Sequence, residues 1–188
     1  MIHKIFMTLS FIWLASEIIL GRLTYHKPAE SADRDRRTLQ MLWLVIIGSI
    51  CLGVWLGLSG VGHLPALLPA APYLATILVS AGLLLRWTAF ISLHRYFTSN
   101  VTILEEHQLI QHGVYGIIRH PAYAGSLLSF LGLGIYFCSW VSLLVIFLPI
   151  LAVFLKRIQT EEAALREAFG KGYEDYSRRT RRLLPGVY

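Results

Sequence analysis

Long apolar runs separated by short polar segments constrain the fold of this chain more than any other feature. Two of them, Leu39 to Leu58 and Tyr73 to Leu93, have the ~20 residues that an α-helix needs to cross the hydrocarbon core of a bilayer. Apolar residues make up 55% of the 188 residues, above the roughly 45–50% of soluble domains. We therefore predict an all-α, multi-pass membrane protein.

Three further apolar runs complete this pattern. The first, Ile5 to Leu20, lacks the basic start and the small-residue cleavage site of a signal peptide, so we expect a retained helix. The runs Tyr123 to Phe137 and Val141 to Leu155 are shorter and are separated by only three residues. They predict a helical hairpin near the C-terminus. The chain is thus expected to have about five transmembrane helices, including this hairpin, and a cytoplasmic C-terminal helix.

The positions of the basic residues favour five spans. The loop after the first run holds five Lys or Arg residues, the segment from Arg86 to Arg119 holds three, and the tail from Lys156 holds eight. Five spans with an external N-terminus leave only Lys4 outside and put 16 of the 17 cations on the cytoplasmic side, as the positive-inside rule requires. We expect an integral protein of a bacterial inner membrane with its functional site facing the cytoplasm. The net charge of +6 is explained by topology and anionic lipid, so no nucleic-acid partner is predicted.

Two charged residues interrupt the apolar runs. Glu17 lies near the end of the first run and is expected to snorkel to the interface, although it could instead face a partner inside the bundle. Arg86 precedes Trp87 in the third run and suits an interfacial anchor. An Arg86 that faced the bundle would instead indicate a functional site.

The segment from His107 to Ser126 concentrates polar chemistry directly before an apolar run. It contains three His, one Arg, two Tyr, three Gly and one Pro, more than a simple loop needs. The histidines are spaced by five and eight residues, with Gly113 between them, so they do not share one helical face and no metal site is predicted. Nucleotide-binding and zinc-protease motifs of soluble proteins are also missing from the sequence.

The tail from Lys156 to Arg179 predicts an amphipathic helix that continues from the last span. Gly170 and Gly172 predict a break in that helix. Arg157 and Glu161 lie four residues apart on one face. This spacing fits an ordinary surface ion pair or a polar anchor beside a buried ligand, and the spacing alone does not decide between them.

These two segments together carry a set of short motifs: His107-x-Leu109, Gly113-x-Tyr115, Arg119-His120-Pro121-x-Tyr123-x-Gly125, Arg157-x-x-x-Glu161-Glu162, Phe169-Gly170-x-x-Tyr173-x-x-Tyr176 and Arg182-x-x-Pro185. This set resembles the isoprenylcysteine carboxyl methyltransferase family, and the resemblance covers about half of the chain, from Phe97 onward. We therefore expect a single membrane domain, residues 1–188, with an N-terminal three-helix part, residues 1–96, and a cofactor-binding methyltransferase part, residues 97–188.

The resemblance implies an integral membrane enzyme that uses S-adenosylmethionine and releases S-adenosylhomocysteine. His120 and backbone donors near Pro121 can meet the carboxylate of the cofactor, and Glu161 or Glu162 can meet its ammonium group. The expected cofactor-binding residues are His107, Leu109, Gly113, Tyr115, His120, Pro121, Tyr123, Glu161 and Glu162, and the expected catalytic residues are Arg157, Glu161 and Arg119.

The methyl acceptor is expected to be a lipophilic small molecule or a lipid, with membrane lipids around it. A carboxylate acceptor needs no general base, and Arg157 or Arg119 could orient it; a thiol or an amine needs a base such as His120 or a glutamate. Two other functions stay open at this point: a membrane reductase with a nicotinamide cofactor, and a small membrane transporter or structural membrane protein.

Overall fold

The computed structural model describes residues 1–24, 33–97 and 109–186. The described residues form helices and contain no β-strand, which confirms the all-α prediction for these ranges. Two isolated bridges, His63 to Ser139 and Ile118 to Arg181, join loops. The elements are α1 (Ile2–Leu23), α2 (Asp33–Leu58), η1 (Pro65–Leu67), α3 (Ala71–Leu93), η2 (His94–Tyr96), η3 (Gly113–Gly116), α4 (Pro121–Tyr136), α5 (Trp140–Phe169) and α6 (Lys171–Arg179).

Four of the described helices are long and apolar enough to cross a membrane: α1, the Leu39–Leu58 part of α2, α3 and α5. The first three agree with the predicted spans. α4 has 16 residues, fewer than the ~20 of a full crossing, so a fifth span and a hairpin of two crossing arms stay predictions. α5 extends well beyond the predicted arm because no Gly or Pro follows Leu155 until Gly170.

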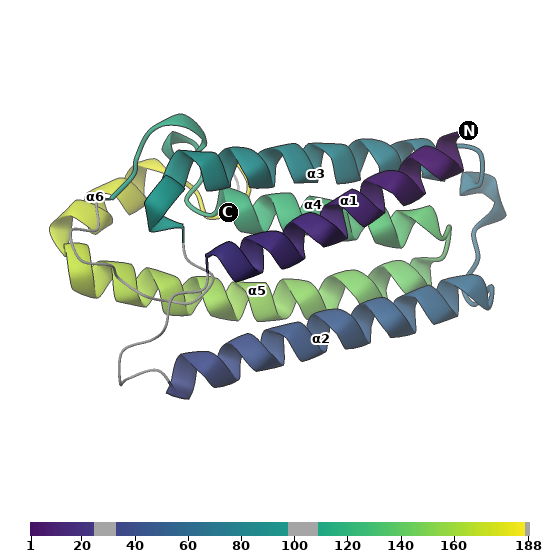
Figure 1. Ribbon diagram of the computed structural model, residues 1–188, viewed down its shortest axis with the longest axis horizontal. Coiled ribbons are helices and arrows are strands. Elements are labelled where there is room, and N and C mark those ends of the chain that lie inside the picture. The colour runs from purple at the N-terminus through teal and green to yellow at the C-terminus, as the bar shows by residue number, and fades with distance from the viewer. Residues whose placement is uncertain (25–32, 98–108, 187–188) are drawn as a thin grey trace.

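Gly170 ends α5 and separates it from α6. Its φ of 50° lies in the left-handed region, which glycine adopts without the steric cost that other residues have. The predicted break in the C-terminal helix is therefore present at Gly170. The turn places α6 across the end of the bundle (Figure 1).

The long helices run alternately up and down the bundle (Figure 1). α3 packs against α1 and α4, and α5 packs against α2 and α4. The ends of α1, α3 and α5, the start of α4 and all of α6 lie at one end of the molecule, which we call the site end. The N-terminus lies at the opposite end.

Glycines bring α3 and α4 into direct backbone contact. A Cβ atom added at Gly82 would lie 2.4 Å from the carbonyl oxygen of Gly125, and one added at Gly125 would lie 2.6 Å from the carbonyl oxygen of Gly82. Small residues allow such close helix approach in membranes. The contact fixes the first turn of α4, and with it His120, against α3.

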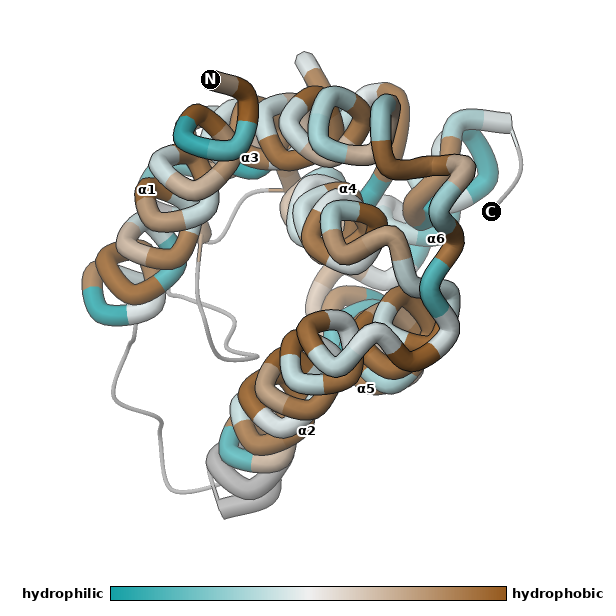
Figure 2. Tube along the Cα trace, turned by 90° about the vertical axis from the view of Figure 1, so that its right-hand side faces the viewer, coloured by the Kyte–Doolittle hydropathy of each residue, from teal (hydrophilic) through white to brown (hydrophobic). Residues whose placement is uncertain are grey.

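The outer faces of the bundle are apolar. Large hydrophobic side chains such as Phe11, Leu44 and Ile77 are more than half exposed on α1, α2 and α3, and hydrophobic segments recur along these helices in Figure 2. Exposed apolar patches of this extent mark a surface that contacts lipid or a partner. The long helices are thus suited to a bilayer on their outer sides, whereas polar residues gather at the site end.

Candidate active site

The two segments that carry the sequence motifs lie side by side at the site end. The backbone N–H groups of Arg119 and His120 donate to the carbonyl oxygens of Arg181 and Arg182, at 2.7 and 3.0 Å. The C-terminal segment therefore lies along the entry to α4. Across this junction, His120 Nδ1 and Glu161 Oε2 are 3.7 Å apart, so both predicted clusters contribute to one site.

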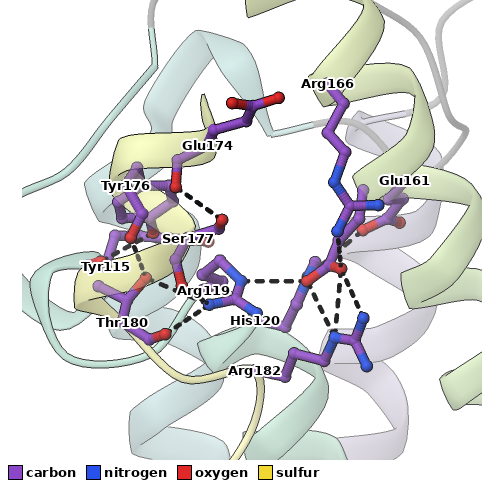
Figure 3. A network of polar contacts seen from close by, with 11 residues as sticks. Tyr115, Arg119, His120, Glu161, Arg166, Glu174, Tyr176, Ser177, Thr180 and Arg182 are labelled. Carbon is purple, nitrogen blue, oxygen red and sulfur yellow. Dashed lines mark hydrogen bonds and ion pairs between the residues drawn. The ribbon is translucent and has the colours of Figure 1, made fainter. Parts of the chain in front are cut away.

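Glu162 is the centre of a buried ionic network, and Figure 3 labels its partners Arg119, Arg166 and Arg182. Its side chain is fully buried and accepts from Arg119 Nε at 3.0 Å, from Arg182 Nη2 at 2.9 Å and from Arg166 Nη2 at 3.2 Å. His120 Nε2 lies 3.4 Å from the same carboxylate. Glu162 thereby joins α5, the entry to α4 and the C-terminal segment. Both oxygens of the Glu162 carboxylate therefore already accept hydrogen bonds from protein groups.

Arg119 connects this network to the end of α6. Besides Glu162, its guanidinium donates to the carbonyl oxygens of Ser177 at 2.9 Å and Thr180 at 2.5 Å. These carbonyls belong to the end of α6, where unpaired helix carbonyls favour a cation. Arg119 therefore fastens α6 to the motif segment (Figure 3).

Glu161 has a different environment although it directly precedes Glu162 in α5. Its side chain is 24% exposed, and Arg157 Nε lies 3.8 Å from its Oε1. The Tyr123 hydroxyl donates to the same carboxylate. The Tyr123 ring also packs edge-on against Phe154. Glu161 is thus an accessible acid between a tyrosine hydroxyl, a buried guanidinium and His120.

Tyrosines from η3 and α6 complete the wall of the site. The Tyr176 hydroxyl donates to the backbone carbonyl of Tyr115 at 2.8 Å. Burial raises the pKa of Tyr176 to about 12. Burial, followed by the nearby Glu161 carboxylate, raises the pKa of the Tyr115 phenol well above its usual value, while Arg86 acts in the opposite direction. Both phenols are therefore neutral at physiological pH and can act as hydrogen-bond donors.

One cavity of about 510 Å³ joins this polar cluster to apolar walls. Its polar part includes Tyr115, Tyr123 and Glu161, and its apolar part includes Trp13 from α1 and Ile46 from α2. Ligand pockets of small molecules occupy ~300–1,000 Å³ and combine apolar walls with a few polar groups. The cavity has this size and character, and it extends from the site end into the apolar part of the bundle.

The structure places most of the predicted site residues at this cavity, but not all. The lining includes Leu109, Tyr115, Arg119, His120, Tyr123, Arg157 and Glu161. Three predicted residues do not line it: Gly113, Pro121 and Glu162. Gly113 starts η3, and Pro121 begins α4. His107 lies outside the described residues.

Glu17 and Arg86 are two charged cavity residues that the sequence did not assign to the site. Glu17 does not snorkel, and Arg86 is not an interfacial anchor, because Arg86 Nε lies 2.5 Å from Glu17 Oε1 inside the bundle. Both residues line the cavity. A charged residue in each of two apolar runs was the available signal, but only the packing of α1 on α3 pairs them.

The fold and the cavity define a helical membrane protein with a mixed polar and apolar site at one end of its bundle. A family model described as phospholipid methyltransferase matches residues 70–172. The chain belongs to this family. The match includes α3, α4 and all of α5, and it ends at the start of α6.

Similar proteins support the predicted resemblance. A "Probable protein-S-isoprenylcysteine O-methyltransferase" of Oryza sativa subsp. indica is 36% identical over 117 residues, which cover 61% of this chain and 61% of that protein. "Protein-S-isoprenylcysteine O-methyltransferase B" of Arabidopsis thaliana is 35% identical over 112 residues, 58% of this chain and 57% of that protein. These matches confirm the resemblance to the isoprenylcysteine carboxyl methyltransferase family. The matched part spans a little under two thirds of the length of these relatives.

A solved structure has the same fold. The eukaryotic intramembrane Ras methyltransferase, isoprenylcysteine carboxyl methyltransferase, aligns with a TM-score of 0.62 at 22% identity, over 99% of this chain and 67% of that chain. At this identity the match concerns the fold. It includes α1 and α2, for which the sequence carried no family motif.

Proposed function

We propose that this protein is an integral membrane methyltransferase that moves a methyl group from S-adenosylmethionine to a lipophilic acceptor. The observation that carries the proposal is that His120, Glu161 and Tyr123 adjoin apolar walls from α1 and α2 in the same cavity. A water-soluble, charged donor and a lipophilic acceptor require both kinds of wall. Family membership and the named relatives support the same reaction class.

The residues present fit S-adenosylmethionine. Glu161 is the accessible acid for its ammonium group, and His120 together with backbone donors near Pro121 suits its carboxylate. The faces of Tyr115 and Tyr123 suit a sulfonium cation, and Leu109 offers an apolar wall for adenine. Glu162 and Arg119 hold these groups in position rather than contact the ligand, because their polar atoms already bond one another and α6.

S-adenosylmethionine held by these residues would supply an electrophilic methyl group, whose bond to sulfur would break as the bond to the acceptor oxygen forms, with S-adenosylhomocysteine as the neutral thioether product. The contribution of the protein is alignment of the two reactants and exclusion of water. Arg157 is buried beside Glu161 and is placed to orient an anionic acceptor. We propose a carboxylate acceptor of the S-isoprenylcysteine type, for which no general base is needed. The relatives' names support this choice.

Access for the acceptor is proposed between α1 and α2. α1 packs on α3, whereas α2 packs on α5, and residues of both helices, among them Leu14 and Leu42, line the cavity. The two helices form separate arms in Figure 2. An acceptor with a prenyl chain would enter from the lipid side, and the cofactor would enter from the site end, which we propose faces the cytoplasm.

Calorimetry on the detergent-solubilised protein tests the cofactor assignment. S-adenosylhomocysteine is expected to bind, whereas NADPH is not. Glu161→Gln is expected to weaken this binding by roughly ten- to hundred-fold, the size of a lost charge-assisted hydrogen bond. Glu167→Gln, an exposed position on the same helix, is the matched control and should bind normally. Equal affinity of both variants would contradict the role of Glu161.

A second measurement tests the reaction. Radiolabelled S-adenosylmethionine should transfer its methyl group to N-acetyl-S-farnesylcysteine, and the product should release methanol under mild alkali as a methyl ester does. A NADPH-dependent reduction without methyl transfer would favour the reductase alternative. The family model and the similar proteins are methyltransferases, so they favour neither the reductase nor a transporter.

A further inference from the structure

An ion pair lies inside the membrane part of the bundle and takes no part in the function proposed above. Glu17 of α1 and Arg86 of α3 meet at 2.5 Å, with side chains only 15% and 17% exposed. Arg86 Nη1 also donates to the carbonyl oxygen of Ala122 at 3.2 Å, in the first turn of α4. Both charged residues line the same cavity as Arg157 and Glu161.

Desolvation of two charges costs free energy, so a buried ion pair is an inefficient way to hold two helices together. Charged side chains at membrane depth face the bundle interior and commonly mark the path or site of a ligand. A buried ion pair is often no more stabilising than well-packed apolar residues of similar size. The position of this pair therefore indicates a role toward a ligand in addition to holding α1 against α3.

The pair also has the right position to meet the polar head of an acceptor. Trp13 lies one turn before Glu17 on α1 and belongs to the apolar wall, whereas Tyr115 near Arg86 belongs to the polar part. Arg86 thus lies where the cavity changes from apolar to polar. The head group of an amphiphilic ligand would rest at this level if its tail occupied the apolar part.

We propose that Arg86 binds the anionic head group of the acceptor and that Glu17 is an internal carboxylate that occupies Arg86 until the acceptor displaces it. The released Glu17 would stay at the wall of the same cavity, where it already lies. The inference rests on the proposed function and deepens it. It assigns the selection of acceptor charge to a residue pair outside the sequence motifs.

Two ligands that differ only in head-group charge test this inference. N-acetyl-S-farnesylcysteine carries a carboxylate, and its primary amide is neutral. Their binding to the S-adenosylhomocysteine complex can be followed by tryptophan fluorescence, since Trp13 and Trp43 line the cavity. The wild-type protein is expected to bind the carboxylate more tightly than the amide. Equal affinities would overturn the inference.

The two substitutions are expected to act in opposite directions. Arg86→Gln should weaken carboxylate binding by roughly tenfold or more and leave the amide unaffected, so that the preference for the carboxylate decreases by the same factor. Glu17→Gln should strengthen carboxylate binding, because the internal competitor is neutral. If the pair only fastens α1 to α3, both substitutions would weaken the binding of both ligands, and that result would also overturn the inference.

Controls separate this outcome from misfolding and from failure of the proposed function. Thr88→Val changes an exposed α3 residue whose hydroxyl bonds only within its helix, and it should bind both ligands like the wild type. If Arg86→Gln does not fold, Arg86→Lys takes its place. Lysine keeps the charge but lacks the planar guanidinium group, so Arg86→Lys should weaken carboxylate binding while Glu17→Gln strengthens it. A wild-type protein that does not bind S-adenosylhomocysteine would instead contradict the proposed function.

Discussion

The adjacent residues Glu161 and Glu162 differ in the burial of their side chains and in their partners. Successive residues of an α-helix point about 100° apart, so Glu161 and Glu162 face different partners. Glu162 points to three guanidinium groups and is fully buried, whereas Glu161 lies at the cavity. The pair thus separates a structural acid from one that is available to a ligand.

The burial of Glu162 leads to a stability prediction. Glu162→Gln keeps the shape of the side chain but removes the charge that Arg119, Arg166 and Arg182 share. Removal of one partner from a buried ion pair typically costs ~3–5 kcal/mol. We expect a loss of this size in the free energy of unfolding in mixed micelles.

The same Glu167→Gln variant that controls the binding experiment serves here, and its stability should change by less than ~0.5 kcal/mol because the position is exposed. Equal stabilities of the Glu162→Gln variant and the wild type would contradict the central role of the network. A stable Glu162→Gln variant that had lost only cofactor binding would instead indicate direct contact with the ligand.

At the scale of the helices, the position of the site depends on how closely α3 and α4 approach. His120 and Pro121 begin α4, so a displacement of α4 displaces the motif. Gly82 and Gly125 allow the two backbones to touch. Lipid offers helices no hydrophobic driving force for association, and such packing therefore carries much of the stability.

A methyl group at this contact tests the arrangement. In Gly82→Ala the added Cβ would lie 2.4 Å from the carbonyl oxygen of Gly125 and equally near Ser129 Oγ, so the helices must separate. We expect a destabilisation of ~1–3 kcal/mol or more and weaker S-adenosylhomocysteine binding by calorimetry. The control is Gly48→Ala on α2, where nothing lies within 4 Å of the added carbon; it should be neutral or stabilising. Equal behaviour of the two variants would refute the close contact.

For the whole molecule, the arrangement of the helices separates the N-terminus from the site end. α1 begins at the far end of the bundle, and α6 lies across the site end (Figure 1). Basic residues gather in the segments at the site end, which favours its placement on the cytoplasmic side. The proposed topology places Lys4 and Lys171 on opposite sides of the membrane.

Cysteine labelling checks this topology. In a background with Cys51 and Cys138 replaced by Ala, a membrane-impermeant maleimide added to intact spheroplasts should label Lys4→Cys and should label Lys171→Cys only after permeabilisation. Both lysines are exposed, so accessibility depends on the side of the membrane. Labelling of both positions from the same side would contradict an odd number of crossings.

The sequence alone was sufficient for the membrane class, the limits of the first three spans, the break at Gly170 and the family. These features depend on local composition, on the backbone freedom of glycine and on residue types at short spacings. The same information predicted one site for Tyr115, His120, Tyr123, Arg157 and Glu161. These residues line one cavity, since the motifs adjoin the helix ends that meet at the site end, and their roles stay predictions.

Only the tertiary structure decided which acid is accessible and which charges are paired. Arg119 and Glu162 belong to a motif but bond each other, and Glu17 was expected at the interface but meets Arg86 on another helix. The partner of a charged side chain depends on contacts between residues far apart in the chain. Whether a buried charge holds helices together or faces a ligand is therefore fixed by helix packing, which no local pattern of residues encodes.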